Sequence, residues 1–599
     1  MTDSNDPESD VATVKDVEIK TETDDDLEFE DNCWTSAITR LQSSVNGFYE
    51  QHKDKVVVGF KGVLFLLYLA YVGYCMYHKF GDEGSIRLLV VTVFVVLYLL
   101  NTILKRFCKL PSLARWTSVW RGSKKALSVR RWIRRSLYLL VSGALAVYIG
   151  LDVVRYNPQN MQSLLGVGVL VVFGFVFSTS PARVNWHPVF WGISVQFVFA
   201  LLILRTSWGY GIFEWIGQRV EEFIEHADAG ALFVFGKSFE EHRIAFAVMP
   251  GVLFFNAMIN VLYHVGVLQA VMRTLGSFLS FCLDCGPIES VVSSANIFIG
   301  LSEVPLLVRP YLKHLTESEL HAIMTCGFAS VSGGILGSYI QLGVPANHLL
   351  SAAVMSAPAA LAITKLMCPE TKKSYFRDGV KMNLGMEKHR NVLSALSAGA
   401  VDSVKIIANI IASMIAFVAV LEFVDQTLEW FGSQAGVHGL TFRLVCSYVF
   451  YPITYTMGLA SQDCGKMGEL LGMKIFGTSS ISFAQLGILR GNRIQLLDYV
   501  ATHNDTWHWQ GSDVILEATN QTLLGGILEE RTEVIATYAL CGFSTVTSIG
   551  ITLGTLVPMA PERKEDITRL IVRALIAGNL ASFMTGSIAG LMYTGQSQQ

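Results

Sequence analysis

The sequence predicts an all-α polytopic membrane protein with inverted repeats, two re-entrant hairpins and about eleven transmembrane spans. Three observations predict this fold class. The 599-residue chain is 51% hydrophobic and only 16% charged, and several uncharged runs reach the ~20 residues that span a bilayer core. A seven-residue phrase occurs twice, and each copy follows an apolar segment that glycine, serine and proline interrupt. Duplicated halves with broken hydrophobic segments are typical of secondary transporters.

The duplicated phrase is the most informative of these observations. Residues 326–332 read Cys-Gly-Phe-Ala-Ser-Val-Ser and residues 541–547 read Cys-Gly-Phe-Ser-Thr-Val-Thr, which gives four identities and three similar exchanges. A chance likeness between two helices rich in small residues is the alternative. Because both copies follow a broken segment, we favour a duplicated fold with its substrate and ion sites between the repeats, near mid-membrane.

Charge predicts how the amino-terminal part is oriented. Residues 1–55 form an acidic tail with few aromatic residues, which we expect to be disordered and cytosolic. No secretory signal peptide is predicted. Residues 56–204 are predicted to hold the amino-terminal spans, with a loop at 105–135 that contains eleven Lys and Arg and no Asp or Glu. The positive-inside rule places this loop in the cytosol. A phosphate-rich partner is the rival explanation, but a position between two spans favours topology, so no nucleic-acid partner is expected.

The rest of the chain is predicted to hold the two repeats. Residues 205–400 form the first repeat region, with a re-entrant hairpin at 284–312. Residues 401–599 form the second, with a hairpin at 443–487 and an extracellular loop at 488–531. Both hairpins are too polar for a plain helix, and irregular backbone at membrane depth must line a protein cavity. The predicted spans lie near 56–78, 86–104, 137–155, 160–180, 187–204, 243–270, 319–343, 347–367, 401–424, 533–557 and 567–595.

Counting these crossings from a cytosolic amino terminus places the carboxyl terminus outside a cell membrane that the chain crosses many times. The sequons at Asn504 and Asn520 then lie in the extracellular loop, where glycosylation is available to them. The ten cysteines are scattered, mostly in apolar runs; only Cys282 and Cys285 have a CxxC spacing, and neither a second such pair nor a His-Cys cluster accompanies them, so no zinc site or disulfide framework is predicted. The absence of an HExxH pair and of a GxSxG elbow argues against an intramembrane enzyme. No cofactor is expected.

Three stretches resemble the concentrative nucleoside transporters. They are 296–307 (Asn-Ile-Phe-Ile-Gly-Leu-Ser-Glu-Val-Pro-Leu-Leu), 318–325 (Ser-Glu-Leu-His-Ala-Ile-Met-Thr) and 536–543 (Ala-Thr-Tyr-Ala-Leu-Cys-Gly-Phe). The resemblance extends over most of the chain outside the acidic tail. It implies a homotrimer in the lipid bilayer that imports nucleosides by sodium-driven alternating access.

The resemblance also implies that sodium is the coupling ion. Its ligands would be the Asn296 side chain, the Ile299 carbonyl, the Ser330 hydroxyl and the Val331 carbonyl. Na⁺ is a hard cation, and a broken helix supplies oxygen ligands from its freed carbonyls and nearby side chains. On the residues alone, Asn296 also fits a helix cap, and Ser330 also fits a small residue that allows close helix contact.

The implied substrate site departs from the pattern of the family. The Gln of hairpin one is replaced by Leu301, the Asn-Glu pair of hairpin two by Thr478 and Ser479, and the Asn of the repeated helix by Thr545. Each lost hydrogen bond to a charged group is worth about 1.5–3 kcal/mol, so we expect altered nucleoside recognition. Leu301 resembles the apolar residue of purine-preferring members, which favours purine nucleosides. The predicted substrate residues are Gly300, Leu301, Ser302, Glu303, Ile335, Thr478, Ser479, Phe543, Thr545 and Ser548.

Glu303 is the most informative single residue. An ionisable group at membrane depth is costly and usually functional, and the alternative is an interfacial carboxylate at the hairpin mouth. Two functions remain open. The first is a sodium-coupled symporter that imports nucleosides, which the retained sodium residues favour. The second is a same-fold carrier of another small polar solute, or a transport-inactive sensor or receptor, which the altered pocket allows.

Overall fold

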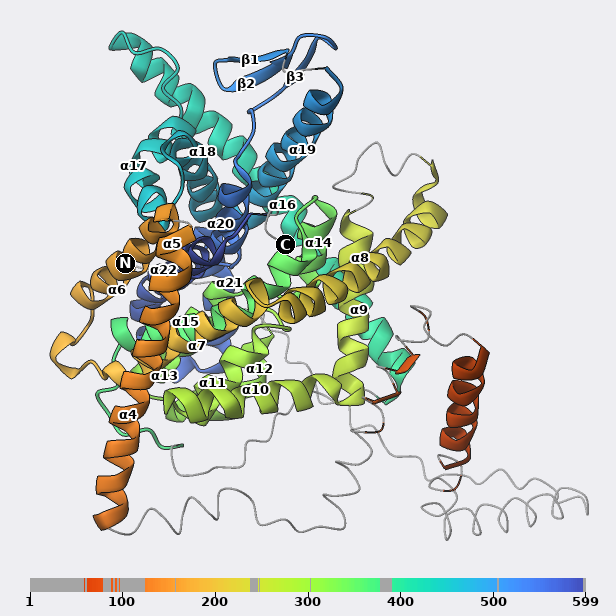
Figure 1. The fold of residues 1–599 in the computed structure, drawn as a ribbon, viewed down its shortest axis with the longest axis vertical. Helices are drawn as coiled ribbons and strands as arrows, with labels where there is room; N and C mark the ends of the chain where they lie inside the picture. Colours follow the sequence, from red (N-terminus) through yellow and green to blue (C-terminus); the bar gives the residue numbers. More distant parts are fainter. Residues whose placement is uncertain are drawn as a thin grey trace, which may run out of the picture. The chain divides into compact units, whose positions relative to one another are not determined.

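The computed structural model describes most of the chain from residue 124 to residue 595, and before it residues 62–78 with scattered neighbours (Figure 1). Residues 134–599 form one compact unit, and the apolar helix Gly62–His78 belongs to a separate one. The acidic tail 1–55 and most of the basic loop 105–135 lie outside the described residues. Further gaps occur at 157, 238–245, 247, 302, 377–389, 504–505 and 596–599.

The first helices follow the predicted amino-terminal spans, and polar side chains cap two of them. Asn185 accepts a hydrogen bond from the backbone N–H of His187 at 3.1 Å, and Thr206 accepts one from Gly209. These caps satisfy amides that the first turn of a helix leaves free. The bounds are α4 (Lys124–Tyr148), a π-helical turn (Ile149–Val153), α5 (Val154–Tyr156), α6 (Met161–Val176), α7 (Trp186–Leu204) and α8 (Ser207–Phe235).

Two series of helices with the same order then follow, which confirms the duplicated architecture. Each series contains a first helix, a second helix, a hairpin of two helical arms, a helix broken in its middle and a closing helix. The first series is α9 (Met249–Val265), α10 (Val267–Leu283), α11 (Pro287–Ala295), α12 (Val304–Val308), α13 (Glu317–Ala329), α14 (Gly333–Gln341) and α15 (Ala346–Met367). The second is α16 (Val392–Gln434), α17 (Phe442–Met457), α18 (Ser461–Gly472), α19 (Ser479–His503), α20 (Glu530–Leu540), α21 (Val546–Met559) and α22 (Lys564–Met592).

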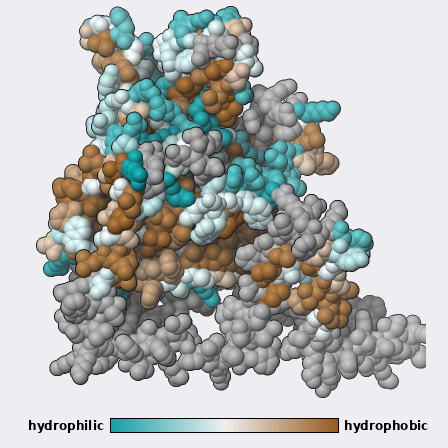
Figure 2. Space-filling view, in the orientation of Figure 1, coloured by the Kyte–Doolittle hydropathy of each residue, from teal (hydrophilic) through white to brown (hydrophobic). Residues whose placement is uncertain are grey.

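The closing helices α15 and α22 form the centre of the compact unit. Most of their residues are buried, although both are apolar enough to cross a bilayer. Small side chains let neighbours approach closely, as at Gly578, where an added Cβ would lie 2.6 Å from the Cβ of Phe328. On the face in Figure 2, hydrophobic residues gather around α6, and hydrophilic residues are more frequent toward the top.

The predicted spans at 319–343 and 533–557 each contain a break inside the repeated phrase, so neither is one continuous helix. α13 ends at Ala329 and α14 begins at Gly333, while α20 ends at Leu540 and α21 begins at Val546. Ser330 and Thr545 have extended backbone. Serine and threonine favour such positions because their hydroxyls bond nearby backbone groups, and the Thr545 hydroxyl caps α21 by accepting from the Ser548 N–H.

Three other segments differ from their predicted bounds. The predicted span 243–270 contains a bend of 78° between α9 and α10, at Gly266, whose φ is +93°. The predicted hairpin 443–487 includes α17, a complete helix of its own, and the two arms of hairpin two are α18 and α19. The second arm continues to His503, inside the predicted loop 488–531. Apolar composition alone does not determine where these helices begin and end.

A small sheet, which the all-α prediction lacks, follows α19. Strands β1 (Trp507–Gln510), β2 (Asp513–Leu516) and β3 (Gln521–Leu523) pair antiparallel in that order. The strands are too short to give a strong alternating pattern, and Gly511, with φ +65°, makes the first turn. Their apolar side chains pack on Leu496 and Tyr499 of α19. The sequon residue Asn520 is exposed beside β3, and Asn504 lies outside the described residues.

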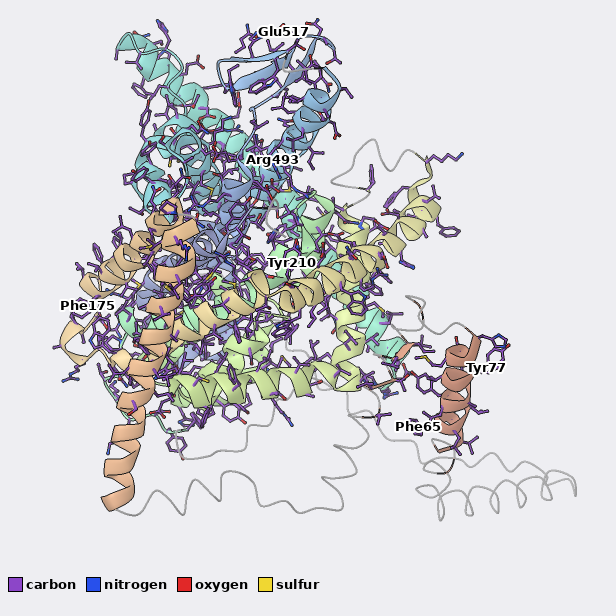
Figure 3. The ribbon with its side chains drawn as sticks, in the orientation of Figure 1. Phe65, Tyr77, Phe175, Tyr210, Arg493 and Glu517 are labelled. Atoms are coloured by element: carbon purple, nitrogen blue, oxygen red, sulfur yellow. The ribbon has the colours of Figure 1, made fainter. Side chains whose placement is uncertain are left out.

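Six helical segments within the described residues are long and apolar enough to cross a membrane when α13 and α14 count as one segment, and seven if the bent pair α9 and α10 also counts as one span. The second hairpin is fixed to the broken helix that follows it. Arg493 on α19 (Figure 3) and Glu533 on α20 pair at 2.8 Å, and the Glu533 side chain is only 8% exposed. Such pairing at low exposure positions the arm more firmly than a surface ion pair would.

Candidate functional site

The two copies of the repeated phrase meet in space. The Phe543 N–H donates to the Ser330 carbonyl at 3.2 Å, so the unwound segment of one repeat contacts that of the other. Gly542 has a φ of +146°, which L side chains rarely adopt. Irregular backbone is tolerated at membrane depth only where protein or a water-filled cavity covers it. Here the hydrogen bond between the two breaks pairs one free backbone group of each.

Gly542→Ala is expected to lower the thermal unfolding temperature of the detergent-purified protein. The added Cβ would lie 2.9 Å from the Phe328 carbonyl oxygen and 2.8 Å from the Ser582 hydroxyl. Such overpacking costs about 1–3 kcal/mol, before the backbone strain is added. Gly550→Ala on α21 is the matched control, since its Cβ meets nothing within 4 Å. Equal unfolding temperatures for both variants would contradict the close crossing.

The tip of each hairpin contacts the break of its own repeat. In the first repeat, the Gly333 N–H donates to the Phe298 carbonyl at 3.1 Å. In the second repeat, the Ser479 hydroxyl donates to the Gly542 carbonyl at 2.8 Å. Both hairpin tips and both helix breaks therefore surround one region of the molecule.

The predicted sodium residues lie on two of these segments, and all of them are buried. Asn296 caps the end of α11 and donates its amide Nδ2 to the Val292 carbonyl at 2.9 Å. Its Oδ1 is buried without any hydrogen-bond donor, and lies 3.9 Å from where a Cβ on Gly327 would be. A buried acceptor without a donor needs an explanation, and a cation supplies one. The Ser330 hydroxyl donates to the Cys326 carbonyl at 2.9 Å, which leaves its oxygen lone pairs available.

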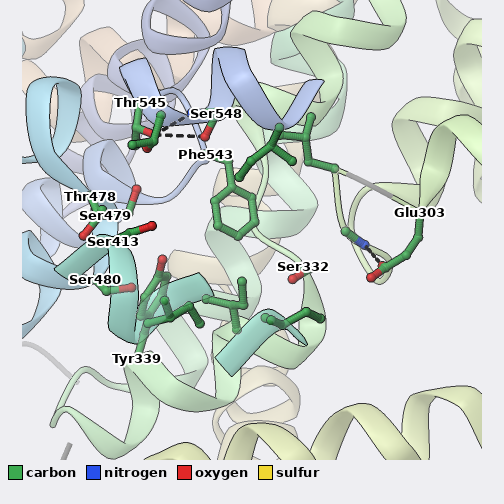
Figure 4. A pocket seen from close by; sticks show the side chains of 17 residues that line it. Glu303, Ser332, Tyr339, Ser413, Thr478, Ser479, Ser480, Phe543, Thr545 and Ser548 are labelled. Atoms are coloured by element: carbon green, nitrogen blue, oxygen red, sulfur yellow. Dashed lines mark hydrogen bonds between the residues drawn. The ribbon is translucent and has the colours of Figure 1, made fainter. Parts of the chain in front are cut away.

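A cavity of about 230 Å³ lies between the hairpin tips, the helix breaks and α16 (Figure 4). Nine of the ten predicted substrate residues line it, and the tenth, Ser302, lies outside the described residues. The structure thus brings together residues from four separate segments, while their roles in binding stay a prediction. The nine are Gly300, Leu301, Glu303, Ile335, Thr478, Ser479, Phe543, Thr545 and Ser548.

Polar groups stand on both sides of the Phe543 ring in Figure 4. Glu303 lies to one side, and its Oε2 accepts a hydrogen bond from the Gly300 N–H at 2.7 Å. On the other side, the Thr545 hydroxyl contacts the Ser548 hydroxyl at 2.9 Å. One carboxylate, several hydroxyls and an aromatic face suit a small solute that has both hydroxyl groups and a flat ring.

Sequence reasoning missed several lining residues. Ser332 and Thr547 belong to the repeated phrase itself, so the duplication held the signal for them. On α16, Ile406, Ile410 and Ser413 follow a helical spacing that puts them on one face. The other missed residues are Tyr339, Ser480 and Ile551.

The hydroxyl of Tyr339 is a further polar group of the cavity wall. The Tyr339 ring stacks on Phe483 with 4.1 Å between centroids, and its side chain is fully buried. Its hydroxyl faces the side chains of Ser479 and Ser480 without forming a hydrogen bond of ordinary length.

Comparisons with known proteins agree with this arrangement. The family models that match are described as Na⁺ dependent nucleoside transporter N-terminus (165–238), Nucleoside recognition (245–346) and Na⁺ dependent nucleoside transporter C-terminus (348–590). Solute carrier family 28 member 3 of Homo sapiens is 38% identical over 95% of this chain and 78% of its own length. Sodium/nucleoside cotransporter 2 of Rattus norvegicus is 35% identical over 92% and 79%. The Mus musculus member 3 is 42% identical over 77% of this chain, a match that spans 63% of the mouse protein.

Solved structures give the same result. CNTnw in an inward-facing, substrate-bound state matches with a TM-score of 0.62 and 30% identity, over 72% of this chain and 97% of that chain. A doubly substituted CNTnw in an outward-facing state matches with the same TM-score and coverage. The chain therefore belongs to the family of Na⁺ dependent nucleoside transporters, which are integral membrane proteins and not enzymes.

Proposed function

We propose that this protein is a sodium-coupled symporter that imports nucleosides by alternating access. The observation that carries the proposal is the cavity enclosed by both hairpin tips and both helix breaks, together with the buried, unpaired oxygen of Asn296 on the first hairpin. Relatives named as sodium/nucleoside cotransporters support both the ion and the solute.

The proposed ion residues and substrate residues share backbone contacts, which gives a physical route for coupling. Asn296, Ile299, Ser330 and Val331 would hold Na⁺, and the bound ion would supply positive charge at the crossing. Ser330 belongs to the ion set, while its carbonyl accepts from Phe543, which lines the cavity. Ordering the Ser330 segment around an ion would therefore also order Phe543. Ion and solute should each raise the affinity for the other, since linkage between sites is reciprocal.

The substrate is proposed to bind between Glu303 and the hydroxyls of the opposite wall. Glu303 pairs with no Lys or Arg among the described residues, so its carboxylate oxygens remain available to solute hydroxyls. Leu301, where a glutamine is the family pattern, presents an apolar surface to the base, which favours purine over pyrimidine nucleosides.

A test with purified protein would compare adenosine, uridine and ribose by isothermal titration, with sodium and with choline in its place. We expect adenosine to bind more tightly than uridine, ribose to bind weakly, and sodium to increase nucleoside affinity. Binding of neither nucleoside would contradict the proposed substrate class. Sodium-independent binding would contradict the coupling.

A same-fold carrier of another small polar solute is the second candidate. Two observations favour it. The Ser479 hydroxyl donates its hydrogen to the Gly542 carbonyl, and the Thr545 hydroxyl caps α21. Both positions therefore offer less to a ribose than the amide and carboxylate of the family pattern. If other polar solutes compete with labelled nucleoside more strongly than nucleosides do, this candidate gains support.

Thr545→Asn is expected to raise affinity for ordinary nucleosides. Asparagine caps a helix at least as well as threonine, so α21 should keep its first turn, and the longer amide can reach a sugar hydroxyl. One added neutral hydrogen bond is worth about 0.5–1.5 kcal/mol, or up to about a tenfold change in Kd. Competition uptake measures this change. Thr545→Val, which keeps the shape and removes the oxygen, is the control, and no gain over it would argue that the pocket fits another solute.

Assembly and orientation complete the proposal. The family resemblance supports a homotrimer in the cell membrane, with a cytosolic amino terminus and an extracellular carboxyl terminus. The exposed Asn520, and Asn504 in the same loop, would then be glycosylated. Glycosidase treatment of the protein and of variants with Gln at either position would test this topology. Cross-linking in membranes would test the trimer.

A further inference from the structure

Lys474 is a fully buried lysine that the proposed transport mechanism does not use. It lies in the π-helical turn Met473–Gly477, between the arms of hairpin two. Its Nζ donates to the Ala539 carbonyl at 3.0 Å and lies 5.8 Å from the centre of the Phe583 ring. No carboxylate pairs with it in the described part of the chain. A buried charge at membrane depth is costly, so such a lysine needs a function.

The position of Lys474 corresponds to that of the proposed sodium residues in the first repeat. Asn296 ends the first arm of hairpin one, α11, and its unpaired oxygen lies 3.9 Å from where a Cβ on Gly327, in the last turn of α13, would be. Lys474 follows the first arm of hairpin two, α18, and contacts Ala539 in the last turn of α20. In both repeats the end of a hairpin arm meets the carboxyl end of a broken helix. Such helix ends carry partial negative charge and favour a cation.

We propose that the Lys474 ammonium is a tethered cation that occupies, in the second repeat, the place that Na⁺ takes in the first. This inference rests on the proposed sodium site and extends it. The lysine neutralises the carbonyl end of α20 and holds hairpin two against it at every stage of transport. The second repeat therefore needs no free ion at this position. The end of α13 would meet a transported sodium ion and the end of α20 a fixed charge, so the two repeats contribute unequally to sodium coupling.

Two substitutions distinguish the effect of the lysine charge from the effect of the space that its side chain occupies. Lys474→Met keeps most of the side-chain volume but removes the ammonium, and we expect nucleoside uptake to fall at least about tenfold, the effect of one buried hydrogen bond from a charged group. Lys474→Ser also leaves room for an ion beside the Ala539 carbonyl. Equilibrium binding of ²²Na⁺ to the purified serine variant should show one more ion per chain than wild type, and high sodium should restore part of its uptake.

Lys466→Ser is the matched control, because Lys466 lies on α18, is partly exposed and stacks on Trp509 at 4.5 Å. It should change neither uptake nor the number of bound sodium ions. Wild-type uptake by Lys474→Met, or no additional sodium in a folded Lys474→Ser, would overturn the proposal. If the serine variant does not fold, Lys474→Asn is measured with the same two outcomes. Wild-type protein in the same assay reports on the proposed function separately. Sodium-independent wild-type uptake would contradict the sodium site on which this inference rests, whereas the outcomes for the Lys474 variants test the inference itself.

Discussion

Glu303→Gln is expected to abolish sodium-driven uptake, or to reduce it about tenfold to a hundredfold, while the protein still folds. The carboxylate lines the cavity and its Oε2 accepts from the Gly300 N–H at 2.7 Å. A glutamine oxygen can accept the same bond, so the hairpin tip should keep its shape. What the variant loses is the negative charge offered to solute hydroxyls and to the nearby ion. A hydrogen bond to a charged group is worth about 1.5–3 kcal/mol.

The measurement for Glu303 is initial-rate uptake, normalised to protein delivered to the membrane. Glu469→Gln is the control, because Glu469 lies on α18 of hairpin two and does not line the cavity. We expect wild-type uptake from the control. If Glu303→Gln is delivered normally and transports like wild type, Glu303 is not part of the substrate site.

Asn296→Ala is expected to have the second large effect, which is a rise in the sodium concentration needed for half-maximal uptake. The substitution removes a buried side-chain oxygen that no donor satisfies among the described residues, and so leaves the ion with fewer ligands. Losing a hydrogen bond or ligand of this kind costs about 1–3 kcal/mol, which corresponds to about a tenfold shift or more in sodium affinity. A sodium activation curve at saturating nucleoside measures the shift.

Asn492→Ala is a suitable control for Asn296→Ala. Asn492 is also a buried amide, but it donates to the Leu524 and Gly526 carbonyls near the sheet. Its loss should lower stability and leave the sodium activation curve in place. A sodium curve that does not move in Asn296→Ala would remove this residue from the ion site, and an equal shift in both variants would attribute the effect to stability.

The fold could be predicted from the sequence where a local pattern defines it. Asn296, Gly300 and Pro305 interrupt an apolar run, and the first hairpin forms there. The breaks after Ala329 and Leu540 could not be predicted, since both phrases are as apolar as a continuous span. Their unwound backbone is stabilised by contacts between the repeats, such as Phe543 with Ser330, which no local window contains.

Part of the site could likewise be predicted from local sequence patterns, and part depends on contacts between distant segments. The resemblance pointed to nine residues that line the cavity, and the duplicated phrase already contained Ser332 and Thr547. Ser413 was missed because a single serine in the long apolar α16 looks like part of a span. Lys474 was missed because a charged residue near a hairpin end is expected to be exposed to water. Only the fold shows that its side chain is buried and contacts the Ala539 carbonyl.

The most direct test of the central claim is nucleoside accumulation in liposomes that contain only this protein. An inward sodium gradient, with the membrane potential clamped, should concentrate labelled adenosine above its external level. Replacing sodium with choline, or collapsing the gradient with an ionophore, should bring the internal concentration back to the external one. Equal adenosine uptake with and without the sodium gradient, by folded protein, would contradict sodium-coupled symport.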